Sequence, residues 1–191
     1  MTRLTNIRKL ILHFILGVLR EMDLYILRHA IAVERFDWSD SDDSRPLSAY
    51  GIAKMKQNAT GLTRLLPKID LILTSPYVRA RQTAEIVCKI YGFKISDKVV
   101  ETDSLTPDSS FEDLFKEFSN YKSDNRVMVV GHQPHLGDLI SYLTSEGAVR
   151  NVPLKKGGVA CIELEREDPR HTGMLHWLLT PKQLRQLAGQ E

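Results

Sequence analysis

Histidine and arginine side chains follow closely on three short apolar stretches of the chain. Arg28 and His29 close the first stretch, Arg79 comes shortly after the second, and His132 follows the third. Arginine presents a planar fork that can bind two phosphoryl oxygens, and a neutral imidazole can accept a phosphoryl group as a nucleophile. A second imidazole can donate to an oxygen on which charge develops. Brought together, these four side chains would suit phosphoryl transfer.

Patterns of apolar and polar residues predict the elements that must position these side chains. Short apolar runs predict six strands, at residues 23–28, 70–74, 98–101, 126–130, 157–165 and 174–179. Apolar residues at helical spacing predict four helices, at residues 48–66, 78–91, 110–121 and 134–144. We expect the last two strands to form an antiparallel pair. The alternation of strands and helices predicts the α/β class, as a three-layer α/β/α sandwich around a mostly parallel sheet.

In sheets of this kind, ligands bind beyond the carboxyl ends of the strands. Functional residues are therefore expected just after residues 28, 74 and 130. His29, the segment that begins at Ser75, and His132 occupy these places. The expected fold thus brings both histidines and the arginines to one rim of the sheet.

Four segments, in order along the chain, resemble motifs of the histidine phosphatase superfamily, also called the phosphoglycerate mutase-like family. They are Arg28-His29-Ala30, similar to RHG; Arg45-Pro46-Leu47-Ser48 followed by Gly51, similar to RxLTxxG; residues 75–84, similar to SPxxRAxQTA; and Gly131-His132-Gln133-Pro134, similar to GHxP. The chain departs from the family at Ala30, and alanine fits there if the backbone does not need a positive φ. The short span between the last two motifs, which contains Leu105-Thr106-Pro107, resembles the small SixA-type phosphohistidine phosphatases.

This resemblance runs from residue 23 to about residue 180 and implies roles for the matching residues. His29 would be the nucleophile, Arg28 and Arg79 would bind the phosphate oxygens, and His132 would complete the pocket. Arg45 would lie at the rim or contact a second phosphate. The reaction would have two steps, phosphoryl transfer to the nucleophile and attack by water on the phosphohistidine. Neither a metal nor another cofactor would be needed, because arginines take the place of a cation.

The proton donor is left open by the sequence. Larger relatives take a glutamate from an inserted segment, whereas this chain offers Glu101, Asp103 and Glu34 as candidates. The absence of an evident acid favours a leaving group that departs easily, such as the nitrogen of a phosphohistidine.

Three functions are compatible with these residues. The first is dephosphorylation of phosphohistidine on a partner protein, and the second is the same chemistry on a small phosphorylated metabolite. The third, from another class, is a phosphate-binding interaction module without turnover. The presence of all four expected pocket residues, Arg28, His29, Arg79 and His132, favours an enzyme.

Bulk composition narrows the partners and the compartment. The chain has 191 residues, of which 42% are hydrophobic and 26% charged, as in globular domains. A formal net charge of +2 gives no general argument for nucleic acid, and we expect no membrane partner. Cys88 and Cys161 are far apart in sequence and are interpreted as buried thiols of a cytoplasmic protein.

Several other polar residues have simpler interpretations. Asp40, Asp42 and Asp43 suggest a solvated loop, since the pattern of a calcium loop is missing. Arg81 points away from Arg79 on the predicted helix and is expected to form a surface ion pair. We do not expect His132 and His135 to bind a metal together, because no carboxylate or cysteine completes such a site.

The amino-terminal segment, residues 1–21, stands apart from the predicted domain, residues 22–191. An apolar run at residues 10–19 follows Arg3, Arg8 and Lys9. It is too short to span a bilayer, and no small-residue cleavage site follows it. We favour a dispensable extension, with a peripheral membrane helix and a cleaved signal as alternatives.

Overall fold

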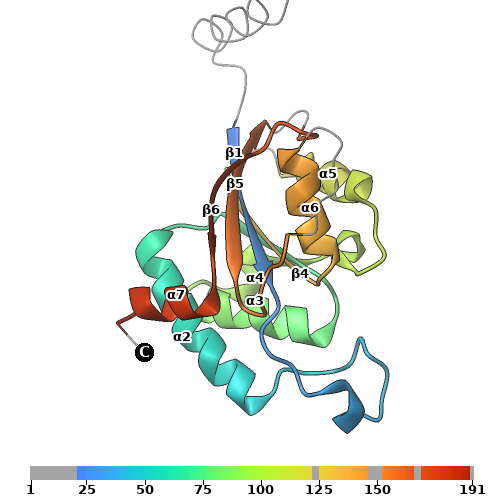
Figure 1. The fold of residues 1–191 in the computed structure, drawn as a ribbon, viewed down its shortest axis with the longest axis vertical. Coiled ribbons are helices and arrows are strands. Elements are labelled where there is room, and N and C mark those ends of the chain that lie inside the picture. The colour runs from blue at the N-terminus through green and yellow to red at the C-terminus, as the bar shows by residue number, and fades with distance from the viewer. Residues whose placement is uncertain (1–20, 122–124, 146–151, 166–168, 190–191) are drawn as a thin grey trace, which may run out of the picture.

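The structure is a computed structural model that describes residues 21–121, 125–145, 152–165 and 169–189 (Figure 1). The predicted extension covers residues 1–21, of which residues 1–20 lie outside the described residues. The strand expected from residue 23 begins two residues earlier, because Glu21 and Met22 pair with Glu165 and Leu164 of a neighbouring strand. Within the described part of the chain, no helix is long and apolar enough to cross a membrane.

Six strands form one sheet whose order brings the predicted strand ends side by side. The strands are β1 (Glu21–Arg28), β2 (Leu71–Thr74), β3 (Val99–Glu101), β4 (Arg126–Gly131), β5 (Val159–Glu165) and β6 (Met174–Leu179). Their order is β3-β2-β4-β1-β5-β6. The first four are parallel to one another, whereas β5 runs antiparallel to both β1 and β6. The expected mostly parallel sheet and its late antiparallel pair are both confirmed.

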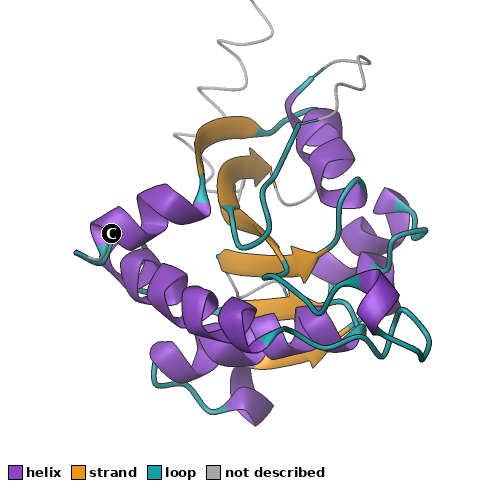
Figure 2. Ribbon diagram, turned by 60° about the horizontal axis from the view of Figure 1, so that its bottom comes forward, coloured by secondary structure: helices purple, strands orange, loops and turns teal. Residues whose placement is uncertain are grey.

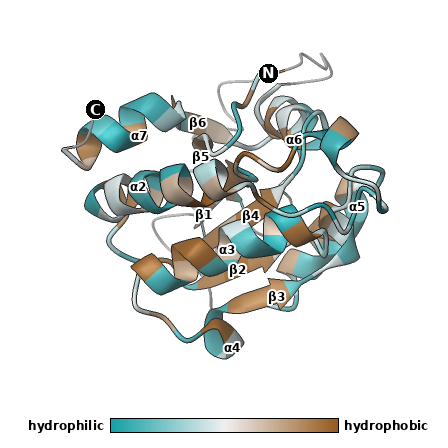
Figure 3. Cartoon of the chain, turned by 90° about the horizontal axis from the view of Figure 1, so that it is seen from below, coloured by the Kyte–Doolittle hydropathy of each residue, from teal (hydrophilic) through white to brown (hydrophobic). Residues whose placement is uncertain are grey.

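Helices cover both faces of this sheet, so the three-layer sandwich is also confirmed (Figure 2). The helices are α2 (Ala49–Leu65), α3 (Val78–Ile90), α4 (Ile95–Lys98), α5 (Phe111–Phe118), α6 (His135–Thr144) and α7 (Pro181–Leu187), with single 3-10 turns at η1 (Arg35–Asp37) and η2 (Asp103–Leu105). Side chains alternate along β1, so that Tyr25 and Leu27 pack with α2, α3 and α7, while Leu24 and Ile26 pack with α5 and α6. Figure 3 shows the resulting apolar strands between helices with one apolar side.

The helices α4 and α7 were not expected from the sequence. α4 has four residues, too few for a helical period to be visible. α7 carried a usable local signal, because Thr180 and Gln183 form a capping box and Pro181 occupies the first turn. Its buried residue Leu184 joins the same apolar cluster as α2.

A backbone contact sets α2 against the segment that follows β1. Ser48 caps the helix by accepting from the backbone N–H of Gly51, and its own N–H donates to the carbonyl of Ile31. A Cβ atom on Gly51 would lie 1.9 Å from that carbonyl oxygen. Glycine is therefore required at this position of the second motif, because no side chain fits between the helix and residues 30–32.

We predict that Gly51→Ala destabilises the protein by about 1–3 kcal/mol, as overpacking against a backbone does. The melting temperature should fall by roughly 2–4 °C for each kcal/mol, measured by circular dichroism or calorimetry. Ala53→Ser is the control, because it adds one atom at an exposed position of the same helix. Equal melting temperatures for Gly51→Ala and the wild type would contradict the close approach.

Candidate active site

The carboxyl ends of three adjacent strands place the predicted residues together. β4 lies between β2 and β1, with Arg28 opposite Gly131 and Thr74 opposite Val130. The rings of His29 and His132, which follow β1 and β4, have centroids 5.2 Å apart. The predicted meeting of the two histidines at one rim is therefore observed.

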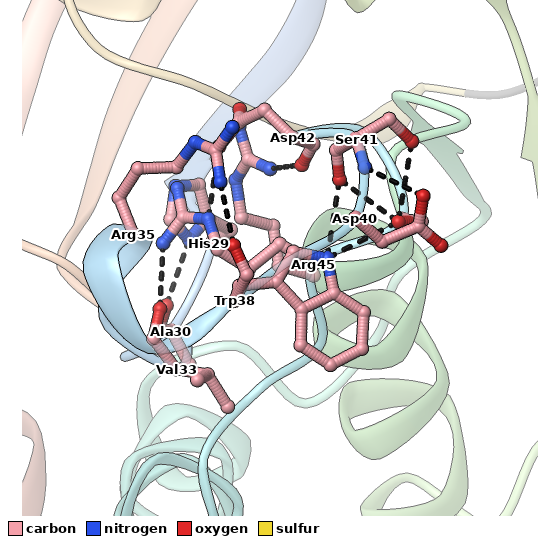
Figure 4. A network of polar contacts seen from close by, with 11 residues as sticks. His29, Ala30, Val33, Arg35, Trp38, Asp40, Ser41, Asp42 and Arg45 are labelled. Atoms are coloured by element: carbon pink, nitrogen blue, oxygen red, sulfur yellow. Dashed lines mark hydrogen bonds and ion pairs between the residues drawn. The ribbon is translucent and has the colours of Figure 1, made fainter.

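His29 is held as a neutral imidazole with one nitrogen available. Its Nδ1 lies 2.7 Å from the carbonyl oxygen of Ala30 (Figure 4). A carbonyl only accepts, so Nδ1 carries the proton and Nε2 keeps its lone pair. Burial of the ring, together with the charges of His132, Arg79 and Arg28, lowers the pKa of His29 well below its ordinary value. This ring has the protonation state that a nucleophile needs.

His132 offers a hydrogen-bond donor at Nδ1 in the tautomer in which Ser75 donates to its Nε2. Its Nε2 lies 2.8 Å from Oγ of Ser75, which also accepts from the N–H of Tyr77. If the serine hydroxyl donates to Nε2, the ring proton resides on Nδ1. Nδ1 is buried and has no hydrogen-bond partner among the described residues. Burial and the charge of Arg79 lower the pKa of His132 to about 3, so this ring is also neutral.

Arg79 is buried and Arg28 is half-buried, and each leaves its Nε without a hydrogen-bond partner among the described residues. Arg28 donates from Nη1 to the carbonyl of Leu154 at 2.9 Å. Arg79, whose side chain is 5% exposed, donates from Nη1 and Nη2 to the backbone oxygen and the carboxylate of Asp42. Its guanidinium also lies over the ring of Tyr77, 4.9 Å from the ring centroid. The Nε atoms of both arginines are buried and unpartnered within the described part of the chain.

Three nitrogens of the side chains that lie near His29 are thus buried without a hydrogen-bond partner among the described residues: Nε of Arg28, Nε of Arg79 and Nδ1 of His132, which is a donor when Ser75 donates to Nε2. A buried donor without a partner costs about 1–3 kcal/mol, so such groups are rare in folded proteins. An anion with several acceptor oxygens, such as a phosphoryl group, would satisfy all three. The geometry fits an oxyanion site with a nucleophile in its wall.

Asp42 belongs to this site, which corrects the interpretation of residues 40–43 as a solvated loop. Its carboxylate accepts from Nη2 of Arg79 and from Nε of Arg45, at 2.8 and 2.9 Å. Partial burial would raise the pKa of Asp42, but the hydrogen bond from Arg45 and the charge of Arg79 outweigh it and lower the pKa. Asp40 and Asp43 are exposed, as expected.

Arg45 supports Asp42 from the outer side of the site (Figure 4). Its Nη1 donates to the carbonyl of Val33 at 2.7 Å, and its side chain is 15% exposed. The expected place near the rim is thus observed, but the observed contacts of its guanidinium are to Asp42 and the backbone.

Backbone contacts hold the nucleophile segment in place. The N–H of Ala30 donates to Oγ1 of Thr83, which donates in turn to the carbonyl of Arg79. The N–H of Gly157 donates to the carbonyls of Arg28 and His29. Among the described residues other than glycine, only His171 has a positive φ, so Ala30 fits where the family has glycine.

The sequence did not indicate Ser75, Tyr77, Asp42 or Gly157 as site residues. A local signal existed for Ser75 and Tyr77, because both lie in the segment that contains Arg79. The contact of Asp42 with Arg79 depends on how a loop folds over the sheet, and the contact of Gly157 uses its backbone. Neither contact has a signal in residue type and spacing.

The candidate proton donors lie apart from these residues. Glu101 forms the expected surface ion pair with Arg81, at 3.7 Å, and lines with Asp103 a separate cavity of about 640 Å³. Glu34 is exposed just before η1. No hydrogen bond or ion pair joins any of the three to His29 in the described structure. His135 contacts Ser109 through Nε2, and no group of three potential metal ligands occurs among the described residues.

We predict that His29 and His132 stay neutral at pH values where ordinary histidines, with a pKa of about 6.5, become protonated. Their imidazole ¹⁵N shifts should stay constant from pH 7.5 to 5, and His132 should titrate near pH 3. Because the unfolded chain binds these protons more readily, stability should decline as the pH falls below about 6.5. NMR with His132→Gln to assign the signals measures this, and titration of either ring near pH 6.5 would contradict it.

Comparison with known proteins connects this geometry to a family. The family model of the histidine phosphatase superfamily (branch 1) matches residues 24–105. An uncharacterized protein of Picosynechococcus is 33% identical over 140 residues, which cover 72% of this chain and 82% of that protein. Phosphohistidine phosphatase SixA of Escherichia coli is 27% identical over 168 residues, which cover 86% and 97%.

Solved structures share the fold. The structure of a protein histidine phosphatase SixA complexed with tungstate aligns with a TM-score of 0.73 at 24% identity, over 85% of this chain and 99% of that chain. A phosphoglycerate mutase of Bacillus anthracis aligns over 90% and 98%, with a TM-score of 0.64 at 11% identity. A putative alpha-ribazole-5'-P phosphatase of Escherichia coli aligns over 84% and 97%, with a TM-score of 0.60 at 20% identity. At these identities, the likeness concerns the fold, which is that of the phosphoglycerate mutase-like proteins.

Proposed function

Because this chain belongs to the histidine phosphatase superfamily, as a SixA-type member, we propose that it hydrolyses phosphohistidine on a partner protein. Membership supports phosphatase activity, and the proposal concerns the substrate, the catalytic residues and the independence of metal. The observation that carries the mechanism is the neutral, buried His29 near Arg28, Arg79 and His132, each of which has a buried nitrogen without a hydrogen-bond partner among the described residues.

In the first proposed step, Nε2 of His29 attacks the phosphorus of the substrate in line with the leaving group. The new bond joins Nε2 to phosphorus, and the P–N bond of the substrate breaks with its electron pair left on the nitrogen. The substrate imidazole leaves as a neutral ring, because its other nitrogen carries a proton. Arg28 and Arg79 bind phosphoryl oxygens, while Nδ1–H of His132 donates to an oxygen as charge develops on it. In the second step, water attacks the phosphohistidine, which releases phosphate and restores the neutral ring.

These cationic and dipolar groups would do the work for which other phosphatases use a metal ion. Asp42 would act as a positioning residue, because it fixes the outer edge of the Arg79 guanidinium and leaves Nε free. Arg45 would act through Asp42, in place of the expected direct contact with phosphate.

A phosphohistidine substrate is supported by the leaving group and by the relatives. No carboxylic acid contacts His29 or His132 among the described residues, and a protonated imidazole leaves without a strong acid. SixA of Escherichia coli is a phosphohistidine phosphatase, and a protein histidine phosphatase SixA binds tungstate, a tetrahedral oxyanion like phosphate.

Cys88 and Cys161 are both buried free thiols, which supports the proposed cytoplasmic location.

A small phosphorylated metabolite is the second candidate substrate. It is favoured by the fold neighbour that is a putative alpha-ribazole-5'-P phosphatase. The chemistry on His29 would be the same, with a phosphate ester as the bond that breaks. The choice between the two substrates is therefore a question of relative rates.

We predict that the wild type hydrolyses a phosphohistidine peptide in the presence of EDTA, and that His29→Ala reduces kcat/KM by at least about 10³-fold, as loss of a nucleophile does. Phosphate release is measured for this peptide and for a panel of phosphorylated metabolites. His176→Ala is the control, because that histidine is 40% exposed and pairs with Glu163 outside the site. Unchanged activity in His29→Ala would refute the mechanism, and faster turnover of a metabolite would refute the substrate assignment.

We further predict that Ser75→Ala lowers kcat about tenfold with little change in KM, because it loosens His132 and leaves the arginines in place. Ser75→Thr should recover part of the loss. In a double-mutant cycle, Ser75→Ala should have no further effect once His132→Gln is present. Additive losses in the double variant would show that the serine acts independently of His132.

A further inference from the structure

A surface pocket of about 340 Å³ adjoins the nucleophile segment and is lined by Ala30 and Ile31, the two residues after His29. Its other walls come from α2, α7 and the loop before β5. Five of the residues that line it are basic: Lys54, Lys155, Lys156, Lys182 and Arg185. We call this feature the basic pocket.

The positive charge of the basic pocket is not balanced locally. None of its lining residues is acidic, and none of its four lysines takes part in an ion pair among the described residues. Lys54 approaches Gln57 and the ring of Tyr50, and Arg185 donates from Nη1 to Asn58, so both have neutral partners. The whole chain has a formal net charge of only +2, so this local excess is not a general property of the surface.

The loop before β5 connects the basic pocket with the proposed catalytic residues. Lys155 and Lys156 lie between Leu154, whose carbonyl accepts from Arg28, and Gly157, whose N–H donates to the carbonyls of Arg28 and His29. A partner chain that presents a phosphorylated side chain to His29 would therefore pass within reach of these lysines.

Negative charge on the other side of the site favours one orientation of such a partner. The cavity after β3 is lined by Glu101, Asp103, Asp113 and Glu117, with Lys116 as the single cation of its lining. Glu101 pairs with Arg81 and Asp113 with Lys116, so the negative excess is carried by Asp103 and Glu117. β3 and β5 lie on opposite sides of the β2-β4-β1 group that carries the site. A negatively charged segment would be repelled on the β3 side and attracted on the β5 side.

The basic pocket consists mainly of lysines, which favours the binding of carboxylates on a flexible segment over the binding of a compact polyphosphate. Compact phosphate sites rely on arginine forks or converging backbone N–H groups, with lysine as a point charge beside them. Lysine ammonium groups are mobile point charges on long stems, and here Lys155 and Lys182 are exposed to solvent. Arg185, the single arginine of the lining, donates from Nη1 to Asn58, and its Nε is buried without a hydrogen-bond partner among the described residues.

We propose that the basic pocket binds acidic residues that flank the phosphohistidine in the substrate protein, an inference that rests on the proposed function. The experiment uses two phosphohistidine peptides, one with four flanking glutamates and one with glutamines in their place. The full-length wild type is compared with Lys54→Gln/Lys155→Gln/Lys156→Gln/Lys182→Gln. The control loses four exposed lysines elsewhere, in Lys56→Gln/Lys68→Gln/Lys89→Gln/Lys94→Gln.

The wild type and the control should hydrolyse the glutamate peptide with a kcat/KM roughly tenfold above that of the glutamine peptide at low salt. In the pocket variant this ratio should fall to about one, and in the wild type it should shrink as salt screens the charges. kcat/KM for the glutamine peptide should be the same in all three proteins. Equal rates for both peptides in the wild type, or a preference that survives in the pocket variant, would overturn the inference.

Binding of the unphosphorylated peptides, followed by fluorescence anisotropy, separates this inference from the proposed function. If neither phosphopeptide is hydrolysed, the proposed function fails, while tighter binding of the glutamate peptide that the pocket variant loses still supports the inference. If inorganic triphosphate binds in the basic pocket and the glutamate peptide does not, the pocket serves a small polyanion and the inference is wrong.

Discussion

The proposed chemistry depends on a neutral imidazole, His29, that lies near three buried nitrogens without a hydrogen-bond partner among the described residues: Nε of Arg28, Nε of Arg79 and Nδ1 of His132. Two apolar clusters, one on each face of the sheet, stabilise the fold that holds these side chains in place. Backbone bonds from Gly157 and the contact of Ala30 with Thr83 then hold the nucleophile segment against the ends of the strands. The site is thus preorganised for an oxyanion before one binds, which is the condition for electrostatic stabilisation of a transition state.

Burial and nearby positive charge both lower the pKa of the histidines. Both oppose a proton on His29, so the groups that would attract phosphate also keep the nucleophile uncharged. The carboxylate of Asp42 forms an ion pair with Arg79 and orients its guanidinium without occupying Nε. Arg45 in turn holds Asp42, so the second motif contributes to the site through this carboxylate. The same motif contains Gly51, whose missing side chain lets α2 approach the residues after β1.

Most of the fold could be predicted because its elements have strong local patterns. The runs at β1, β2 and β4 are apolar and short, and the rule that ligands bind at carboxyl ends placed His29 and His132 together. α4 was not predicted because a helical period cannot be recognised in four residues, and α7 was not predicted because its capping box is a short signal. Within the site, residue types identified the histidines and arginines. Asp42 was assigned to solvent, because its partners Arg79 and Arg45 reach it only after the loop has folded. The backbone role of Gly157 likewise depends on tertiary structure.

A crystal structure of the protein soaked with vanadate, an oxyanion that can adopt the geometry of a phosphoryl group in transfer, tests this arrangement of donors around His29. We expect vanadium bonded to Nε2 of His29, with its oxygens accepting from Nε of Arg28, Nε of Arg79 and Nδ1 of His132. Vanadate bound elsewhere, with Nε2 of His29 left free and the three donors still without a partner, would contradict it.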